Sequence, residues 1–269
     1  SGSAATIGNT NTAVGRDSLL TNVASDRNTA IGYQSLKTMT SASTVDSFNT
    51  ALGYQSGLAV TSGIKNTIIG ASAGVALTTP GHNVAVGYAS QGASTTGEFN
   101  TSLGGLSMGV GVTTGDYNTA IGYAAGNDLT SGEKNVFLGA GAGENITTGA
   151  FNTALGYGAL STENAYGRNV AIGYLALATL DAAADAHNTA VGFNAGAAVS
   201  TGVQNTLVGS VAGDALTTGA YNVALGTSAL STEDTGSRNV AIGWSALEDQ
   251  NFDGDAYNTA VGYAAGKEL

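Results

Sequence analysis

The pattern of apolar and polar residues repeats about every 17 positions, and each repeat opens on an asparagine. If that Asn is position 1, position 2 is always Thr or Val, position 4 is Val, Ile or Leu, position 5 is Gly, and position 8 is Ala or Ser. The Asn residues stand at 11, 28, 49, 66, 83, 100, 118, 135, 152, 169, 188, 205, 222, 239 and 258. Such short segments are too brief for independent sheets, whereas stacked coils bury a continuous core. We therefore predict an all-β fold, a parallel β-roll or β-solenoid of about fifteen 17-residue coils.

Two columns of identical residues are predicted to be structural. Stacked Asn side chains, such as Asn118 and Asn188, can hydrogen-bond along the column from one coil to the next. Position 5, occupied by Gly122 and Gly192 in the same coils, is expected to need a positive φ or to leave room for a neighbouring backbone. A substitution to Ala at position 5 should therefore destabilise the fold.

A second period of four coils, about 70 residues, lies over the first. Position 9 alternates pairwise between large residues and Gly, as in Leu160, Leu177, Gly196 and Gly213. Position 3 is usually Ala with an aromatic residue at position 6, but three coils invert this order, which predicts that positions 3 and 6 share one space within or between subunits. We expect one continuous array over residues 11–269. Residues 1–10 are interpreted as a cloning remnant and a partial coil, and the whole as a piece of a longer array.

Composition limits the classes of function. The chain has 41 Gly, one Pro, no Cys and a formal net charge of −11. Nucleic-acid binding needs clustered cations, so the charge argues against such a partner. No apolar run approaches the roughly 20 residues of a membrane-spanning helix, so membrane insertion by this segment is not expected. The only histidines are His82 and His187, and neither belongs to a catalytic or cofactor-binding motif. We expect no enzyme and no cofactor.

The residue before each Asn is a ring or a cation in most coils. At about 4.8 Å per coil, these side chains would form an exposed stripe, either a surface ladder or a recognition surface for sugars. We call this set the pre-Asn stripe; it comprises Arg27, Phe48, Lys65, His82, Phe99, Tyr117, Lys134, Phe151, Arg168, His187, Gln204, Tyr221, Arg238 and Tyr257.

Lengthened coils and threonine pairs supply two further candidates. Carboxylates gather in the lengthened coils, either as solvated loops or as Ca²⁺ ligands without EF-hand spacing. They are Asp181, Asp185, Asp249, Asp253 and Asp255. Ordinary coils carry Thr pairs such as Thr78-Thr79 and Thr217-Thr218, which would give a hydroxyl array two residues wide when stacked.

The segments NTAIGY (28–33) and NVAIGY (169–174) resemble the NSVAIG-type repeat of trimeric autotransporter adhesin heads. Similar runs occur in fibre proteins of phages and marine bacteria, and the resemblance covers residues 11–266. It implies a left-handed parallel β-roll, assembled as a parallel trimer on a cell or virion surface. The implied partners are host cell-surface glycans or matrix proteins.

The expected function is that of a structural or adhesive segment of an extracellular trimeric fibre. Positions 3, 6 and 9 carry more apolar surface than one thin roll can hide, which predicts a homotrimer that shares this surface. The alternatives are an ice-binding solenoid that uses the Thr array and, more remotely, a β-helix enzyme that acts on polysaccharides. The adhesive surface is expected on the pre-Asn stripe and the lengthened loops.

Overall fold

The computed structural model describes residues 9–40, 45–162 and 166–268, and confirms the predicted parallel β-solenoid. Within these ranges the chain forms strands and turns and no helix. It divides into two compact units, Ser1–Lys134 and Asn135–Leu269, which are described separately. The interpretation of Ser1, Gly2 and Ser3 as a cloning remnant lies outside the described residues.

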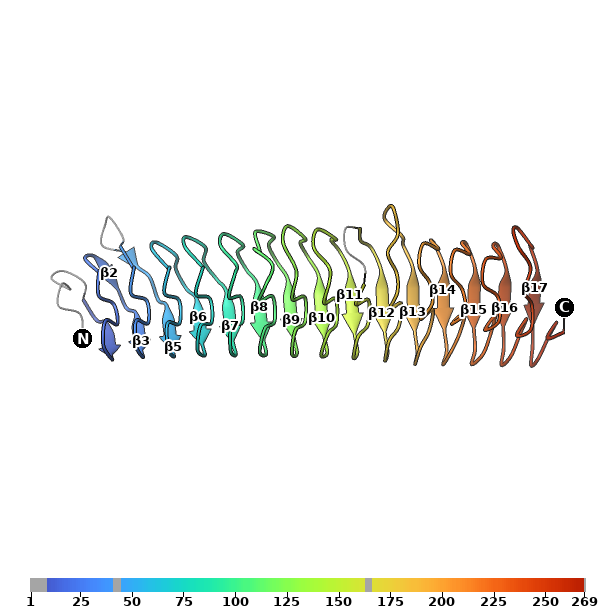
Figure 1. Cartoon of the computed structure of the whole chain (residues 1–269), viewed down its shortest axis with the longest axis horizontal. Helices are drawn as coiled ribbons and strands as arrows, with labels where there is room; N and C mark the ends of the chain where they lie inside the picture. Colours follow the sequence, from blue (N-terminus) through green and yellow to red (C-terminus); the bar gives the residue numbers. More distant parts are fainter. Residues whose placement is uncertain (1–8, 41–44, 163–165, 269) are drawn as a thin grey trace. The chain divides into compact units, whose positions relative to one another are not determined.

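The first unit stacks one three-residue strand per coil (Figure 1). Consecutive strands pair in parallel and in register, so that Ala30, for example, pairs with Ala51. A second, two-stranded ladder joins β2 (Ser25–Asp26) to β4 (Val45–Asp46). The main strands are β1 (Thr12–Val14), β3 (Thr29–Ile31), β5 (Thr50–Leu52), β6 (Thr67–Ile69), β7 (Val84–Val86), β8 (Thr101–Leu103) and β9 (Thr119–Ile121).

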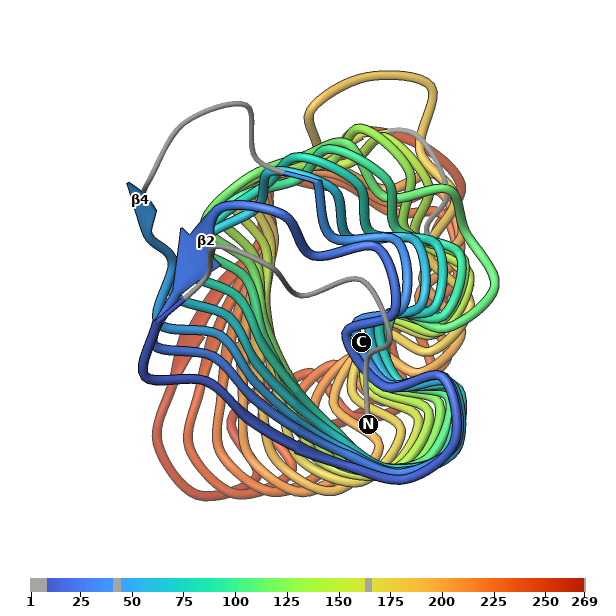
Figure 2. The same ribbon diagram turned by 90° about the vertical axis from the view of Figure 1, so that its left-hand side faces the viewer.

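The second unit repeats the same arrangement, with parallel, in-register pairs such as Ala190 with Leu207. Within each unit, successive coils follow nearly the same path when viewed along the stack (Figure 2). The strands are β10 (Val136–Leu138), β11 (Thr153–Leu155), β12 (Val170–Ile172), β13 (Thr189–Val191), β14 (Thr206–Val208), β15 (Val223–Leu225), β16 (Val240–Ile242) and β17 (Thr259–Val261).

Each strand presents one residue inward and two outward. The middle residue, position 3, is fully buried in most coils, whereas positions 2 and 4 are half-buried or exposed. This follows from the alternation of side chains along a strand. The core is completed by position 8 and by the large residues at position 9, such as Leu36 and Leu177.

The glycine at position 5 is required for both of the reasons that the sequence suggested. Gly53 has φ +141°, and a Cβ at that position would lie 2.5 Å from the carbonyl oxygen of Gly70 in the next coil. Gly192 has φ +146°, and its Cβ would lie 2.6 Å from the carbonyl carbon of Gly209. Gly122 has φ +134°. An L side chain is excluded both by the backbone conformation and by the next coil.

The asparagine column is hydrogen-bonded as predicted, but mainly through the backbone. The Asn188 backbone N–H donates to Oδ1 of Asn169 at 3.1 Å, and Asn188 Nδ2 donates to the carbonyl of Gly202 at 2.8 Å. In the first unit, Asn118 bonds to Asn100 through both its backbone N–H and its Nδ2, at 2.8 and 3.1 Å. These buried amides therefore fix the register between coils.

The prediction that positions 3 and 6 share one space within the chain is wrong, because position 3 points inward and position 6 points outward beyond the Gly turn. The partner of a large position 3 is instead a glycine at position 9. A Cβ on Gly57 or Gly74 would lie 3.0 or 3.3 Å from Ile68, and one on Gly196 or Gly213 would lie 2.7 or 2.9 Å from Leu207. The four-coil period therefore arises because a bulky position 3 excludes Leu from position 9 of its own and the preceding coil.

Candidate functional site

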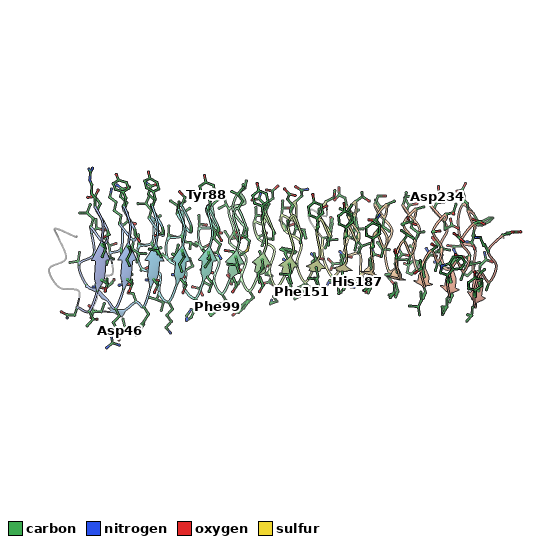
Figure 3. All side chains as sticks on the ribbon, turned by 90° about the horizontal axis from the view of Figure 1, so that it is seen from below. Asp46, Tyr88, Phe99, Phe151, His187 and Asp234 are labelled. Atoms are coloured by element: carbon green, nitrogen blue, oxygen red, sulfur yellow. The ribbon has the colours of Figure 1, made fainter. Side chains whose placement is uncertain are left out.

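The pre-Asn stripe lies along one edge of the strands and is held in an unfavourable backbone conformation. In Figure 3, Phe99 lies along one edge of the ribbon of the first unit, and Phe151 and His187 lie along one edge of the ribbon of the second unit. Every member of the stripe has a left-handed backbone, with φ between 51° for Phe48 and 66° for Arg168. Bulky residues rarely adopt this conformation, which costs about 1–2 kcal/mol relative to ordinary φ values.

Glycine would avoid that cost, yet the stripe never contains it. Besides the invariant glycine at position 5, each coil has two other positions with a positive φ, and both accept Gly: position 7 at Gly141 and Gly158, and position 9 at Gly57 and Gly196 among others. The residue before Asn is a large side chain in nearly every coil. We infer that these side chains are retained for the contacts that they make.

Many of those contacts run from coil to coil within the stripe. The His82 ring stacks on Phe99 with centroids 4.8 Å apart, and Phe99 stacks on Tyr117 at 5.0 Å. In the second unit, the Arg238 guanidinium lies over both Tyr221 and Tyr257, at 5.1 and 5.6 Å. These stacks cover ring faces, so the stripe presents mainly ring edges and polar tips to solvent.

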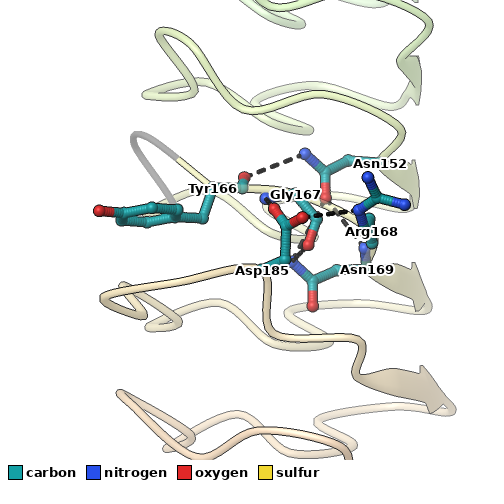
Figure 4. A network of polar contacts seen from close by, with 6 residues as sticks. All are labelled: Asn152, Tyr166, Gly167, Arg168, Asn169 and Asp185. Atoms are coloured by element: carbon teal, nitrogen blue, oxygen red, sulfur yellow. Dashed lines mark hydrogen bonds and ion pairs between the residues drawn. The ribbon is translucent and has the colours of Figure 1, made fainter.

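Arginines of the stripe are also paired with aspartates of the next coil. Arg27 pairs with Asp46 at 2.8 Å and Arg238 with Asp255. Figure 4 shows the third pair: Arg168 Nε donates to Asp185 at 2.6 Å, and the Gly167 N–H donates to the same carboxylate. The bond from Arg168 lowers the pKa of Asp185.

A sequence signal marks these pairs, although the sequence reasoning missed it. Each stripe Arg is followed in the next coil by an Asp two residues before the stripe position, as Arg168 is followed by Asp185 two residues before His187. Because stacked coils are about 4.8 Å apart, that spacing brings the two charges together.

The interpretation of the loop carboxylates as Ca²⁺ ligands is not supported. Asp185 and Asp255 are engaged by arginines, and Asp253 accepts a hydrogen bond from Thr235 at 2.8 Å. Asp181 is exposed. No group of three or more His, Cys, Asp or Glu residues suited to a metal ion occurs within the described residues. The acidic side chains instead balance stripe cations or face solvent.

The threonine pairs do not form a hydroxyl array two residues wide. The first Thr of a pair turns its hydroxyl to the next coil: Thr78 donates to the carbonyl of Thr95 at 3.1 Å, and Thr217 to that of Asp234 at 2.9 Å. Thr113 is fully buried and donates to Leu129. The second Thr, such as Thr79, is exposed, so the solvent-facing column is a single residue wide.

A buried carboxylate organises the last lengthened loop. Glu233 is fully buried and accepts hydrogen bonds from the Gly236 N–H at 2.6 Å, from Gln250 Nε2 at 2.8 Å and from the Phe252 N–H at 3.3 Å. These donors anchor the loop to the preceding coil. No sequence motif indicated this site, because its donors come from main-chain groups 3 and 19 residues away and a side chain 17 residues away.

The outward face of the strands is uncharged and carries an apolar column at position 4 beside a column of Thr and Val at position 2. Positions 2 and 4 are Thr, Val, Ile or Leu in every coil. Several position-4 side chains remain between 39 and 66% exposed: Val14, Leu52, Leu103, Leu138, Leu155, Leu225 and Val261. We call positions 2 and 4 together the outward face. Positions 3 and 9, by contrast, are mostly buried inside the coil, so of the three positions expected to be shared between subunits only position 6 stays exposed.

Position 6 forms a second exposed aromatic column, on the edge opposite the pre-Asn stripe. In the first unit, Tyr88 lies across the ribbon from Phe99 (Figure 3). Consecutive rings stack, as in Tyr33 with Tyr54 and Trp244 with Tyr263, with centroids 5.4 and 4.8 Å apart. We call the residues at position 6 the position-6 column; they are Arg16, Tyr33, Tyr54, Ala71, Tyr88, Gly105, Tyr123, Ala140, Tyr157, Tyr174, Phe193, Ser210, Thr227, Trp244 and Tyr263.

Comparison with known proteins gives no match to any family model, curated protein or solved structure. Among the described residues, no helix is long and apolar enough to cross a membrane. The features that bear on function are therefore the outward face, the pre-Asn stripe and the position-6 column.

Proposed function

We propose that this chain is a structural and adhesive segment of an extracellular fibre, in which three parallel copies join through their outward faces. The supporting observation is the apolar column at position 4, in which seven Val and Leu side chains remain exposed and the other Val and Ile side chains are half-buried. Monomeric proteins rarely expose continuous apolar patches larger than a few hundred Å².

A second copy of the chain suits this face better than an unrelated partner. Two parallel copies carry the same spacing of about 4.8 Å per coil, so apolar side chains meet at every coil without a mismatch. The face has no charged residue, whereas the net charge of −11 lies elsewhere, so association does not bury like charges. In a symmetric trimer, each copy can make this side-by-side contact with both neighbours, so the assembly closes on itself.

Charged substitutions on the outward face test the assembly. Leu52→Lys and Leu103→Lys place ammonium groups in the proposed interface, and Val112→Lys is the matched control because Val112 is 53% exposed but lies off the strands. Light scattering should give three times the 26.3 kDa chain mass for the wild type and the control, and one chain mass for the face variants. A monomeric wild type would contradict the proposal.

The adhesive contacts are assigned to the pre-Asn stripe, because its side chains persist against an unfavourable backbone. Repeated weak contacts along three chains gain strength through avidity, with no deep pocket. Binding to a glycan array and to cells should fall for the variant Phe151→Ser, Tyr221→Ser, Tyr257→Ser. Unchanged binding by a folded triple variant would show that the stripe only stabilises the stack.

Ice binding is the second candidate function. The Thr residues at position 2, rather than the threonine pairs, would form the ice-binding surface. In the first unit, Thr12, Thr29, Thr50 and Thr67 stand in consecutive strands of the outward face, at one per coil. If the wild-type protein is monomeric, binds no glycan and halts ice growth, this regular face acts on ice.

A further inference from the structure

The position-6 column of the first unit alternates rings with small residues. From the coil of Asn49 onward, it runs Tyr54, Ala71, Tyr88, Gly105 and Tyr123. Each small residue therefore lies between two tyrosines that are two coils apart.

Uninterrupted parts of the column show how a ring is normally placed. In the second unit, Tyr157 stacks on Tyr174 at 5.5 Å with 13° between the planes, and Tyr174 stacks on Phe193 at 5.2 Å with 9°. One ring per coil thus lies nearly parallel to its neighbours. At Ala71 and Gly105 one ring is missing, so the flanking tyrosines are two coil spacings apart, about 10 Å from ring centre to ring centre. We call the space between them a slot.

The slots are open and their walls face solvent. Tyr88 is 66% and Tyr123 63% exposed, and among the described residues no other ring or cation stacks on either of them. A Cβ on Gly105 would touch only Tyr123 Cδ2 at 3.7 Å and the Tyr88 carbonyl oxygen at 3.9 Å, both ordinary contacts. The rings of the pre-Asn stripe differ, because their faces are covered by neighbouring side chains.

We propose that each slot binds one hexopyranose ring of a surface glycan, sandwiched between its two tyrosines. This inference goes beyond the proposed function, because the slots lie on the edge opposite the pre-Asn stripe. Tyrosine faces carry negative potential that attracts sugar C–H groups, and the phenol hydroxyls at the rim can hydrogen-bond to sugar hydroxyls. A puckered pyranose ring, with its axial hydrogens, is thick enough to contact both tyrosines when their ring centres are about 10 Å apart.

Filling and opening slots provides matched variants. Ala71→Tyr and Gly105→Tyr restore the missing ring, and Gly105 lacks the positive φ of the neighbouring glycines, so a side chain fits there without strain. Tyr174→Ala is the converse change, because it leaves Tyr157 and Phe193 as the walls of a new slot. The filling variants should each bind one sugar ring fewer per chain, and Tyr174→Ala should bind one more.

The binding can be followed by ¹⁹F NMR of protein that carries 3-fluorotyrosine at its 11 tyrosines. The probes are methyl β-glucopyranoside, methyl β-galactopyranoside and N-acetylglucosamine at millimolar concentrations, with p-cresol as the flat aromatic comparison. At least one pyranoside should shift the signals of Tyr54, Tyr88 and Tyr123 in the wild type. In Gly105→Tyr, the shift of Tyr123 should be lost.

Three results would overturn the inference: no slot tyrosine responds to any pyranoside, only p-cresol binds, or the slot signals are shielded from a soluble paramagnetic probe in the assembled protein. The last result would mean that a neighbouring copy fills the slots. Light scattering on the same samples separates this outcome from failure of the fibre proposal, because the filling variants should keep the wild-type mass. A trimer that binds no sugar in its slots refutes only this inference.

Discussion

The strictest feature of the repeat, glycine at position 5, allows a quantitative test through Gly192→Ala. At φ +146° a side chain is strained by about 1–3 kcal/mol. The new Cβ would also lie 2.6 Å from the Gly209 carbonyl carbon, so the next coil must move. That movement weakens the bond from the Gly209 N–H to the Val191 carbonyl, now 2.8 Å, and bonds beside it, each worth about 1 kcal/mol. We expect Gly192→Ala to destabilise the protein by about 3–5 kcal/mol.

Gly254→Ala is the control that separates strain from collision. Gly254 has φ +111°, but no described atom lies within 4 Å of an added Cβ, so only the conformational cost applies. Urea unfolding followed by circular dichroism gives both free energies. If the two variants differ by less than about 0.5 kcal/mol, which is the usual limit of additivity between independent sites, close coil packing does not explain the invariant glycine.

Three further predictions concern the column, the core and the ion pairs. Asn188→Ala should lower the free energy of unfolding by about 2–4 kcal/mol, because the buried Asn205 N–H and the Gly202 carbonyl lose their hydrogen-bond partner. Urea unfolding measures this loss, and Asn188→Asp, which keeps an acceptor for the Asn205 N–H, is the control. Leu207→Ala should lower the free energy of unfolding by about 2–5 kcal/mol, and adding Gly213→Leu should recover part of that loss. If the effects of the two substitutions simply add in a double-mutant cycle, Leu207 and position 213 do not share one space in the core. Because the pKa of Asp185 is lowered, its pair with Arg168 stabilises the protein fully above the ordinary Asp pKa, and this stabilisation is lost as pH falls from there through the lowered pKa. Because the pair is exposed, Asp185→Asn should remove less than about 1 kcal/mol at neutral pH and nothing in acid, as thermal melts across pH would show.

The sequence by itself determined the coil and its register. A β-branched residue, an invariant Gly and an invariant Asn every 17 residues permit only a stack in which like residues lie above one another, because each short strand must find its hydrogen-bond partners in the next coil. The structural roles of Asn188 and Gly192 followed from that geometry alone.

Tertiary structure decided which side of the coil each residue faces. The large and small residues at positions 3 and 6 trade places along the sequence, but the turn at Gly192 and its equivalents sends position 6 outward, so the real steric partner of Leu207 is Gly213 rather than Ser210. Because positions 3 and 9 point into the coil, the exposed aliphatic side chains are those of the outward face. The spacing of residues along the sequence determines which residues stack on one another. The path of the backbone determines whether they stack in the core, at an interface or in solvent.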